Sequence, residues 1–148
     1  MNNQLNAKDP VLLYHFTCEM HLPMIARTGE LKPSESNAFC SKARDVVWMT
    51  SLPTPENNGL IFADGIPDDL NKTFVRFTIY RRRTMISWLE WTTKVGMSKE
   101  MMDILIHTAN AEETHKFWYV SEESVTSRNW LIVENLHTGE IYYKAKGF

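Results

Sequence analysis

Two apolar segments of the sequence carry small polar side chains beside aromatic ones. The first contains His15 and Thr17, and the second contains Trp48 followed by Thr50 and Ser51. Hydroxyl groups and an imidazole make directed hydrogen bonds, and aromatic rings provide flat walls for stacking. This combination favours a pocket for a ligand with ribose hydroxyls and planar rings. The alternative for His15 is a core histidine whose hydrogen bonds are satisfied within the fold.

A second pattern places zinc-binding side chains at equal spacing, His15-x2-Cys18-x2-His21, with Cys40 downstream. The two histidines fall on different predicted elements, however, and no Cys-x2-Cys pair completes a ligand set. A nucleophilic Cys–His pair lacks local support as well. We therefore expect no metal site and two reduced cysteines, which pack as small apolar side chains.

The densest basic stretch is Arg81, Arg82 and Arg83, and Arg76 and Trp88 lie close to it in the sequence. One interpretation is a solvated strand end. The other is a groove for nucleic-acid phosphates or for an acidic protein face, with the indole ring available for stacking. The sequence has no G-x-G-x-x-G and no G-x4-G-K-[ST] motif, so we expect neither a Rossmann nor a P-loop nucleotide site.

The 148 residues, 43% of them hydrophobic, predict one domain over residues 11–148 after a flexible leader of residues 1–10. The 16 basic and 18 acidic side chains give a net charge of −2, which excludes a polycation that coats nucleic acid. No apolar run approaches the roughly 18–20 residues that cross a bilayer, and the first ten residues are polar. We therefore expect a cytoplasmic protein with no membrane partner.

Hydrophobic periodicity predicts the elements that must position these side chains. Strands are expected at residues 11–17, 46–51, 73–80, 116–122, 129–136 and 141–144, and helices at 18–28, 87–95 and 98–107. A long loop is expected over residues 52–72, which contain three prolines and two glycines. Because the helices lie between groups of strands, the fold class is α+β, with a compact split sheet that is largely antiparallel.

Local signals mark the ends of the helices. Pro23 fits the first turn of the first helix, and Gly29 is placed to end it. Ser98 is the expected N-cap of the third helix. In the first helix the residues at helical spacing are Met20, Met24 and Ile25, and in the third helix the residues expected to be buried are Met101, Met102, Ile104 and Leu105.

Three stretches of the first third of the chain follow one order of motifs: residues 14–17 (YHFT), residues 25–34 (IARTGELKPS) and residues 47–51 (VWMTS). This order resembles the amino-terminal half of small ADP-ribosyltransferase-like domains, in particular the DarT-like and the phage or bacterial members. There, a Y-H-x-T strand precedes a helix, a G-x-L-x-P segment and a strand ending in small hydroxyl residues. The resemblance covers residues 11–52 and implies a split-sheet α+β domain that binds NAD.

The resemblance also implies roles for individual residues. His15 matches the histidine that hydrogen-bonds the ribose on the adenosine side of NAD. Thr50 and Ser51 match the hydroxyl residues that support the nicotinamide pocket. The NAD-binding residues expected on this basis are His15, Thr17, Trp48, Thr50, Ser51 and Tyr119.

The third motif of the family is a glutamate on or before a late strand, which supports the positive charge that develops on the nicotinamide-side ribose. At the start of that strand this sequence has Asn129 instead. The available carboxylates are Glu122, Glu123 and Glu134. We expect Glu123 to be catalytic together with His15, since Glu123 leaves a strand into a loop that could face the pocket. The alternative is an exposed acidic turn.

The function expected from the resemblance is mono-ADP-ribosyl transfer from NAD, the co-substrate, to a protein or nucleic-acid acceptor that Arg76 and residues 81–83 help to engage. A second class is a catalytically inactive binding module on the same scaffold, for example a phage-encoded protein that blocks a host or defence factor. A third class is an enzyme that uses NAD to remove a phosphate from RNA, for which Arg27, Arg44 and Arg76 are available.

Overall fold

The central strand of the fold is β1 (Leu12–Thr17), which pairs with another strand on each side. The protein is α+β, with a mostly antiparallel sheet of seven strands and a few short helices. The structure is a computed structural model that describes residues 10–34, 45–56, 60, 66–109, 111 and 113–148. Most of the expected leader (residues 1–9) and part of the expected loop over residues 52–72 lie outside this range.

The seven strands follow the order β5-β6-β3-β1-β4-β8-β9. Besides β1, they are β3 (Val47–Thr50), β4 (Val75–Tyr80), β5 (Met85–Ser87), β6 (Trp118–Ser121), β8 (Trp130–Asn135) and β9 (Ile141–Lys144). A separate small sheet joins β2 (Glu30–Leu31) to β7 (Val125–Thr126). The six strands expected from periodicity are confirmed, whereas β2, β5 and β7 are too short to give a periodic signal and were missed.

The junction between β1 and β3 is the weakest of the large sheet. β1 pairs with β4 along its whole length, from Leu12 opposite Tyr80 to Thr17 opposite Val75. Across the described residues, β1 pairs with β3 only where Tyr14 faces Thr50. The expected split sheet is therefore corrected to one continuous sheet whose two halves are joined through a single residue pair.

Strand β4 follows the alternation of its sequence. Val75, Phe77 and Ile79 are at most 1% exposed, and they belong to a core against which Leu22 and Ile25 pack. A second core lies in the other half of the sheet, around the fully buried Trp88, Trp91, Val46 and Val120. The first core also contains Val47 and Met49 of β3 and Tyr119 of β6, so it crosses the β1–β3 junction, whereas the second core takes the alternate residues of β6 and packs on the other face of the sheet.

The helices are short and begin and end at the expected signals. They are α1 (Leu22–Thr28), α2 (Trp88–Lys94) and α3 (Lys99–Thr108), with 3-10 turns η1 (Glu19–His21), η2 (Asp68–Leu70), η3 (Thr114–Phe117) and η4 (Ser127–Asn129). Ser98 Oγ accepts a hydrogen bond from Met101 N, which confirms the predicted N-cap. Gly29 ends α1 with φ of 67°, a left-handed conformation that a glycine adopts without strain.

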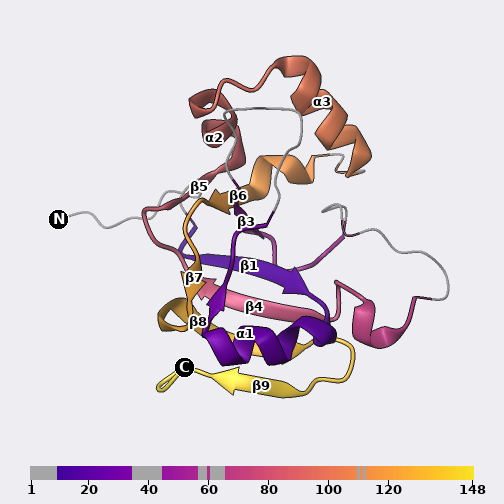
Figure 1. Ribbon diagram of the computed structural model, residues 1–148, viewed down its shortest axis with the longest axis vertical. Coiled ribbons are helices and arrows are strands. Elements are labelled where there is room, and N and C mark those ends of the chain that lie inside the picture. Colours follow the sequence, from indigo (N-terminus) through magenta and orange to yellow (C-terminus); the bar gives the residue numbers. More distant parts are fainter. Residues whose placement is uncertain (1–9, 35–44, 57–59, 61–65, 110, 112) are drawn as a thin grey trace.

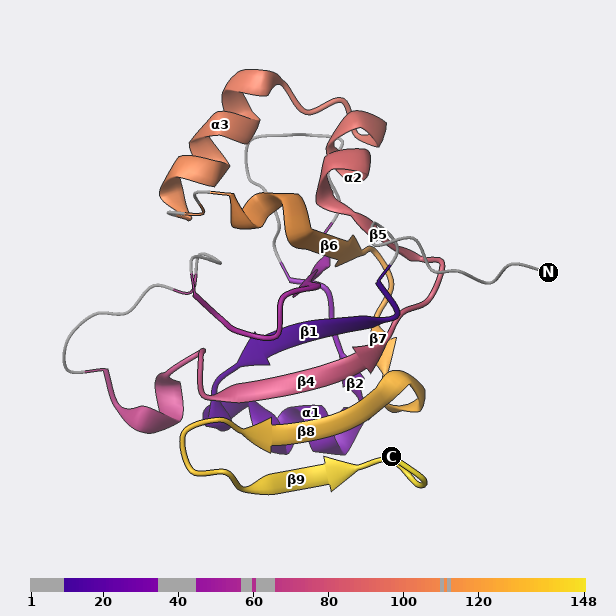
Figure 2. The same cartoon turned by 180° about the vertical axis from the view of Figure 1, so that it is seen from behind.

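The helices lie in two groups (Figure 1). α1 covers the half of the sheet that contains β4 and β8, while α2 and α3 lie at the opposite end of the molecule, beyond β5 and β6. Seen from behind, β1, β4, β8 and β9 lie in front of α1 (Figure 2). No helix in the described part of the chain has the length and apolar character needed to cross a membrane.

Several apolar side chains at helical spacing do not enter either core. Met20 is 54% exposed and Met24 is 58% exposed. Ile104 of α3 is 51% exposed, so its predicted burial is wrong. Because α3 has no fully buried residue, it packs on the molecule through half-buried side chains such as Leu105. Both methionines border a cavity, which explains why apolar side chains remain uncovered there.

Candidate functional site

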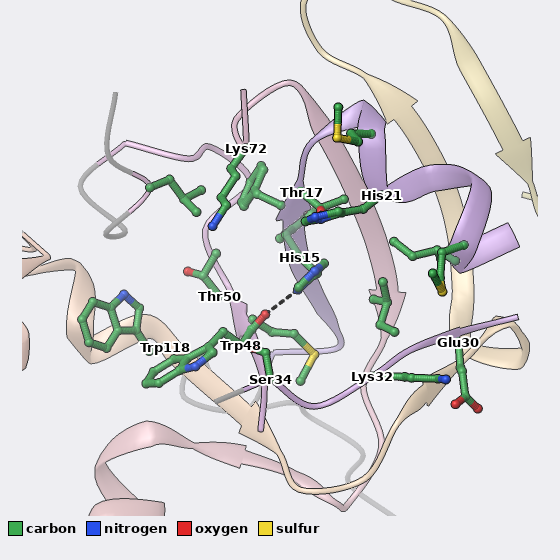
Figure 3. Close-up of a pocket in the computed structure, with 18 of the residues that line it drawn as sticks. His15, Thr17, His21, Glu30, Lys32, Ser34, Trp48, Thr50, Lys72 and Trp118 are labelled. Carbon is green, nitrogen blue, oxygen red and sulfur yellow. Dashed lines mark hydrogen bonds between the residues drawn. The ribbon is translucent and has the colours of Figure 1, made fainter. Parts of the chain in front are cut away.

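A pocket with a volume of about 680 Å³ lies between β1 and β3. Its other walls come from η1, α1, β2 and the C-terminal end of α3. Figure 3 shows His15 at the centre, with Lys72 and Thr50 on one side and Glu30 and Lys32 on the other. The apolar part of the wall includes Met20, Met24, Ile25, Trp48, Leu105 and Trp118. A few polar groups in a largely apolar cavity are typical of a small-molecule site.

The side chain of His15 bridges the weak junction between the two halves of the sheet. Its Nδ1 lies 2.7 Å from the carbonyl oxygen of Trp48. A carbonyl oxygen can only accept, so Nδ1 carries the proton and donates it, and Nε2 is a hydrogen-bond acceptor. No partner for Nε2 is found among the described residues. His15 therefore connects β1 to β3 and also leaves an acceptor atom for a ligand.

Burial keeps the His15 imidazole neutral. Loss of solvent lowers its pKa below the usual 6.5, and the hydrogen bond to Trp48 raises it by a smaller amount. The neighbouring imidazole of His21 lowers the pKa further, since two positive charges would repel. The net shift is downward, so the ring stays uncharged at neutral pH.

The lowered pKa of His15 should make the protein less stable as the pH falls below about 6.5. His15 of the unfolded chain takes up a proton near its ordinary pKa, whereas the folded protein keeps the ring neutral to lower pH. The unfolded state then binds more protons, and unfolding becomes more favourable. Urea midpoints at about pH 8 and about pH 5 should therefore differ less in His15→Asn than in the wild type.

The control for this measurement is His107→Asn, because His107 lies exposed on α3 and outside the pocket lining. It should leave the pH dependence of the urea midpoint unchanged. If His15→Asn showed the same dependence as the wild type, the neutral state of His15 would be contradicted. The Asn side chain can still donate to the Trp48 carbonyl, so the comparison is between two folded proteins.

Two threonine hydroxyls accompany His15. Thr17 is 5% exposed, and its Oγ1 lies 3.1 Å from Nδ1 of His21. Thr50 is 3% exposed, and its Oγ1 accepts a hydrogen bond from the backbone N–H of Leu52 at 3.1 Å. The hydroxyl proton of Thr50 remains able to donate to a ligand, because a hydroxyl has one donor and two acceptor sites.

Two tryptophans form an aromatic wall. The rings of Trp48 and Trp118 meet edge to face, with centroids 5.9 Å apart and an interplanar angle of 88°. Trp118 also packs against the buried Trp88, with centroids 5.0 Å apart. This support from the second core holds the Trp118 ring in place, so it can serve as a rigid surface for a planar ligand.

Four of the six residues expected to bind NAD line the pocket: His15, Thr17, Trp48 and Thr50. Ser51 and Tyr119 do not. Tyr119 follows Trp118 in β6 and therefore faces the other side of the sheet, whereas Ser51 follows the end of β3. Tyr119 is buried in the first core, with the guanidinium of Arg81 above its ring. The structure therefore does not bring Ser51 and Tyr119 to this pocket.

Glu123, which the sequence analysis places at the site, does not line this pocket either. Its side chain is exposed in the turn after β6, where its backbone oxygen accepts a hydrogen bond from Ser121 Oγ. The pocket lies at the opposite end of β6, where Trp118 is found. A strand of four residues separates the two ends by about 13 Å. Glu122 is hydrogen-bonded to Nε1 of Trp91 and does not line the pocket either.

The basic residues do not form one groove. Arg76 lies near the start of β4 and pairs with Glu134 at 3.0 Å. Arg81, Arg82 and Arg83 follow the other end of β4, roughly 17 Å away at the rise of a strand. The structure thus corrects the expectation that Arg76 and residues 81–83 act together on an acceptor. None of the four arginines lines the pocket.

The pocket brings together residues from segments far apart in the sequence, and their side chains define its chemistry. No family model, curated protein or solved structure matches this chain. What the site can do therefore follows from its own groups: a neutral imidazole acceptor, hydroxyl donors, two ammonium groups and an aromatic wall.

Several polar residues of the pocket were not predicted as ligand-binding, among them His21, Glu30, Lys32 and Lys72. His21 was considered only as part of a zinc pattern, and Lys72 falls at the end of a loop with no motif. The described residues contain no cluster of three or more His, Cys, Asp or Glu side chains that could hold a metal ion. Cys18 is 2% exposed and is absent from the pocket lining, and Cys40 lies outside the described residues.

Proposed function

We propose that this chain binds NAD in the His15 pocket and transfers its ADP-ribose group to a macromolecular acceptor, and that its fold is a variant of the ADP-ribosyltransferase-like fold. One observation carries the proposal. The three stretches that resemble the family, at residues 14–17, 25–34 and 47–51, all contribute side chains to the same pocket. Motifs shared by chance would have no reason to converge on one cavity.

The groups in the pocket suit a dinucleotide. The neutral Nε2 of His15 can accept a hydrogen bond from a ribose hydroxyl, and the hydroxyl of Thr50 can donate one. The ammonium groups of Lys72 and Lys32 offset the negative charge of a diphosphate. Trp118 offers an aromatic surface to a base or to the nicotinamide ring.

Transfer requires support for positive charge at the ribose carbon as nicotinamide leaves. In the described residues the carboxylate that lines the pocket is Glu30, on β2, and not Glu123. We assign this supporting role to Glu30. The bond from nicotinamide to C1 of its ribose breaks, and its electron pair leaves with the ring nitrogen. The acceptor then bonds to the same carbon and loses a proton.

Calorimetric titration with NAD and an assay for released nicotinamide test this function, and matched carboxylate variants test the assignment of Glu30. We expect Glu30→Gln to bind NAD within about 3-fold of the wild type and to release nicotinamide about 100-fold more slowly, the scale of losing one charge-stabilising group. Glu123→Gln should behave like the wild type in both assays. The same loss in Glu123→Gln and not in Glu30→Gln would contradict the assignment.

One observation favours the second function class, a binding module without catalysis. Figure 3 places Glu30 at the edge of the pocket, across from Thr50 and Lys72. A wild-type protein that binds NAD but releases no nicotinamide would support this class. The phosphate-removing class has less support, because Arg27 and Arg76 do not line the pocket and Arg44 lies outside the described residues.

A further inference from the structure

The pocket contains a second imidazole, that of His21, in different surroundings from His15. His21 lies at the end of η1, and its side chain is exposed at the side of the cavity where Thr17 is found. The side chain of His15 is hydrogen-bonded to Trp48 O, whereas the one hydrogen bond found for the side chain of His21 in the described residues is to Thr17. The two rings therefore meet the same ligand space from different walls, His15 half-buried and His21 exposed to solvent.

Thr17 fixes the orientation of the His21 ring. Its Oγ1 lies 3.1 Å from Nδ1 of His21, and Thr17 itself is held on β1, where it pairs with Val75 of β4. When Nδ1–H donates to this hydroxyl, Nε2 carries the free electron pair. An imidazole held through one nitrogen with the other nitrogen free has the arrangement of a general base.

The charges of the two imidazoles are linked. Burial and the nearby imidazole of His21 both disfavour a proton on His15. The pKa of His15 is therefore lowered, and its ring stays neutral. Because the side chain of His21 is exposed, it can pass a proton that it receives in the pocket to water.

We propose that His21 is the proton acceptor for the nucleophile in the transfer reaction, with Thr17 as its positioning residue. This inference rests on the proposed function. As the bond from C1 of the ribose to nicotinamide breaks, nicotinamide leaves as a neutral ring with the electron pair. The oxygen or nitrogen of the acceptor bonds to C1, and its proton passes to Nε2 of His21 and then to solvent. Water takes the place of the acceptor when NAD is hydrolysed.

The charged groups around His21 come from several elements. His15 of β1, Lys72 before β4, and Glu30 and Lys32 of the opposite wall share its pocket. Glu19 lies on the same turn and receives a hydrogen bond from Asn135. Asp68 and Asp69 lie on η2, which packs against η1. Removing His21 also takes away its share in lowering the pKa of His15, so a pH effect belongs to His21 when it disappears with the imidazole and added imidazole restores the rate.

The experiment compares the wild type with His21→Gln for NAD affinity and for the rate of nicotinamide release across pH, with water as the acceptor. We expect His21→Gln to keep NAD affinity within about 3-fold and to lower kcat by about 100-fold, as loss of a general base does. The fall in kcat at acidic pH should disappear in the variant. Added imidazole should restore part of the rate in His21→Ala, and His107→Gln should match the wild type.

Thr17 gives a second, independent measurement. Thr17→Val removes the hydroxyl that orients His21, and we expect it to lower kcat by about 10-fold, while Thr17→Ser recovers the rate. A residue that only supported the fold would not give this recovery together with an altered pH profile.

The outcomes separate this inference from the proposed function. If the wild type cleaves NAD and His21→Gln cleaves it equally fast, His21 is not the proton acceptor, while the NAD site stands. If His21→Gln loses affinity in proportion to rate, His21 binds substrate and the inference is overturned. If the wild type binds NAD without cleaving it, the base role is overturned but NAD binding is retained. If it binds no NAD, the proposed function fails as well.

Discussion

We expect His15→Ala to bind NAD about 30-fold more weakly than the wild type or worse, and to lower the free energy of unfolding by about 2 kcal/mol. Two contacts are lost at once. The ligand loses the acceptor Nε2, and the carbonyl of Trp48 loses the N–H that His15 donates to it at 2.7 Å. In the described chain β1 and β3 pair only at Tyr14 and Thr50, so the hydrogen bond from His15 to Trp48 O is a large part of the hydrogen bonding between these two strands. Calorimetry and urea unfolding measure the two effects.

His15→Asn separates these two roles. The amide N–H2 of Asn can donate to the Trp48 carbonyl in place of Nδ1, but Asn has no atom at the position of Nε2. We therefore expect stability near that of the wild type together with the loss of NAD affinity. Wild-type affinity in His15→Asn would show that Nε2 does not contact the ligand, and the NAD assignment would lose its central residue.

The pocket residues that the sequence analysis singled out come from strands with a clear pattern. His15, Thr17 and Thr50 lie in apolar runs whose length and alternation define β1 and β3, and a strand pattern fixes which side chains share a face. The same alternation puts Val75, Phe77 and Ile79 of β4 together on a buried face. Local periodicity is sufficient there because burial of one face stabilises the strand.

Other residues expected at the site lie elsewhere, because the register of strand pairing and the end of the strand at which a residue lies determine whether it reaches the pocket. The sequence around Glu123 indicates a strand that enters a loop, but it does not say that the pocket lies at the other end of β6. That depends on the antiparallel pairing of β6 with β3, which puts Trp118 opposite Thr50. Arg76 and Arg81 were grouped because they are close in sequence, although a strand carries them to opposite ends.

The residues that sequence reasoning missed belong to walls formed by tertiary packing. Met20 and Met24 have the spacing of a helical apolar stripe, and such a stripe usually faces a core. In this fold the stripe borders the pocket and stays more than half exposed. Lys72 reaches the pocket only because β4 pairs with β1, and no local signal predicts that.

The wall that carries Met20 and His21 depends on a buried contact far along the chain. Asn135, at the end of β8, is 1% exposed, and its Nδ2 donates to the carboxylate of Glu19 on η1. Its Oδ1 accepts from the backbone N–H groups of His137 and Thr138 at 2.8 and 2.9 Å, in the turn before β9. One side chain therefore ties the pocket wall to the β8–β9 hairpin.

Asn135→Asp should lower the free energy of unfolding by about 3 kcal/mol, although it changes one atom, because it places a second carboxylate against Glu19 in a buried position. Oδ1 and its two backbone donors are kept, and the Tyr142 hydroxyl, which accepts from Nδ2 at 3.1 Å, can donate to the new oxygen instead, so the loss reports mainly the contact with Glu19. Adding Glu19→Gln supplies an amide that can donate to the new carboxylate, and we expect the double variant to regain most of the stability, while Glu19→Gln alone loses about 1 kcal/mol. Urea midpoints of the four proteins measure this coupling. Additive losses in the double variant would show that the two side chains act independently and that the hairpin does not support the pocket wall through them.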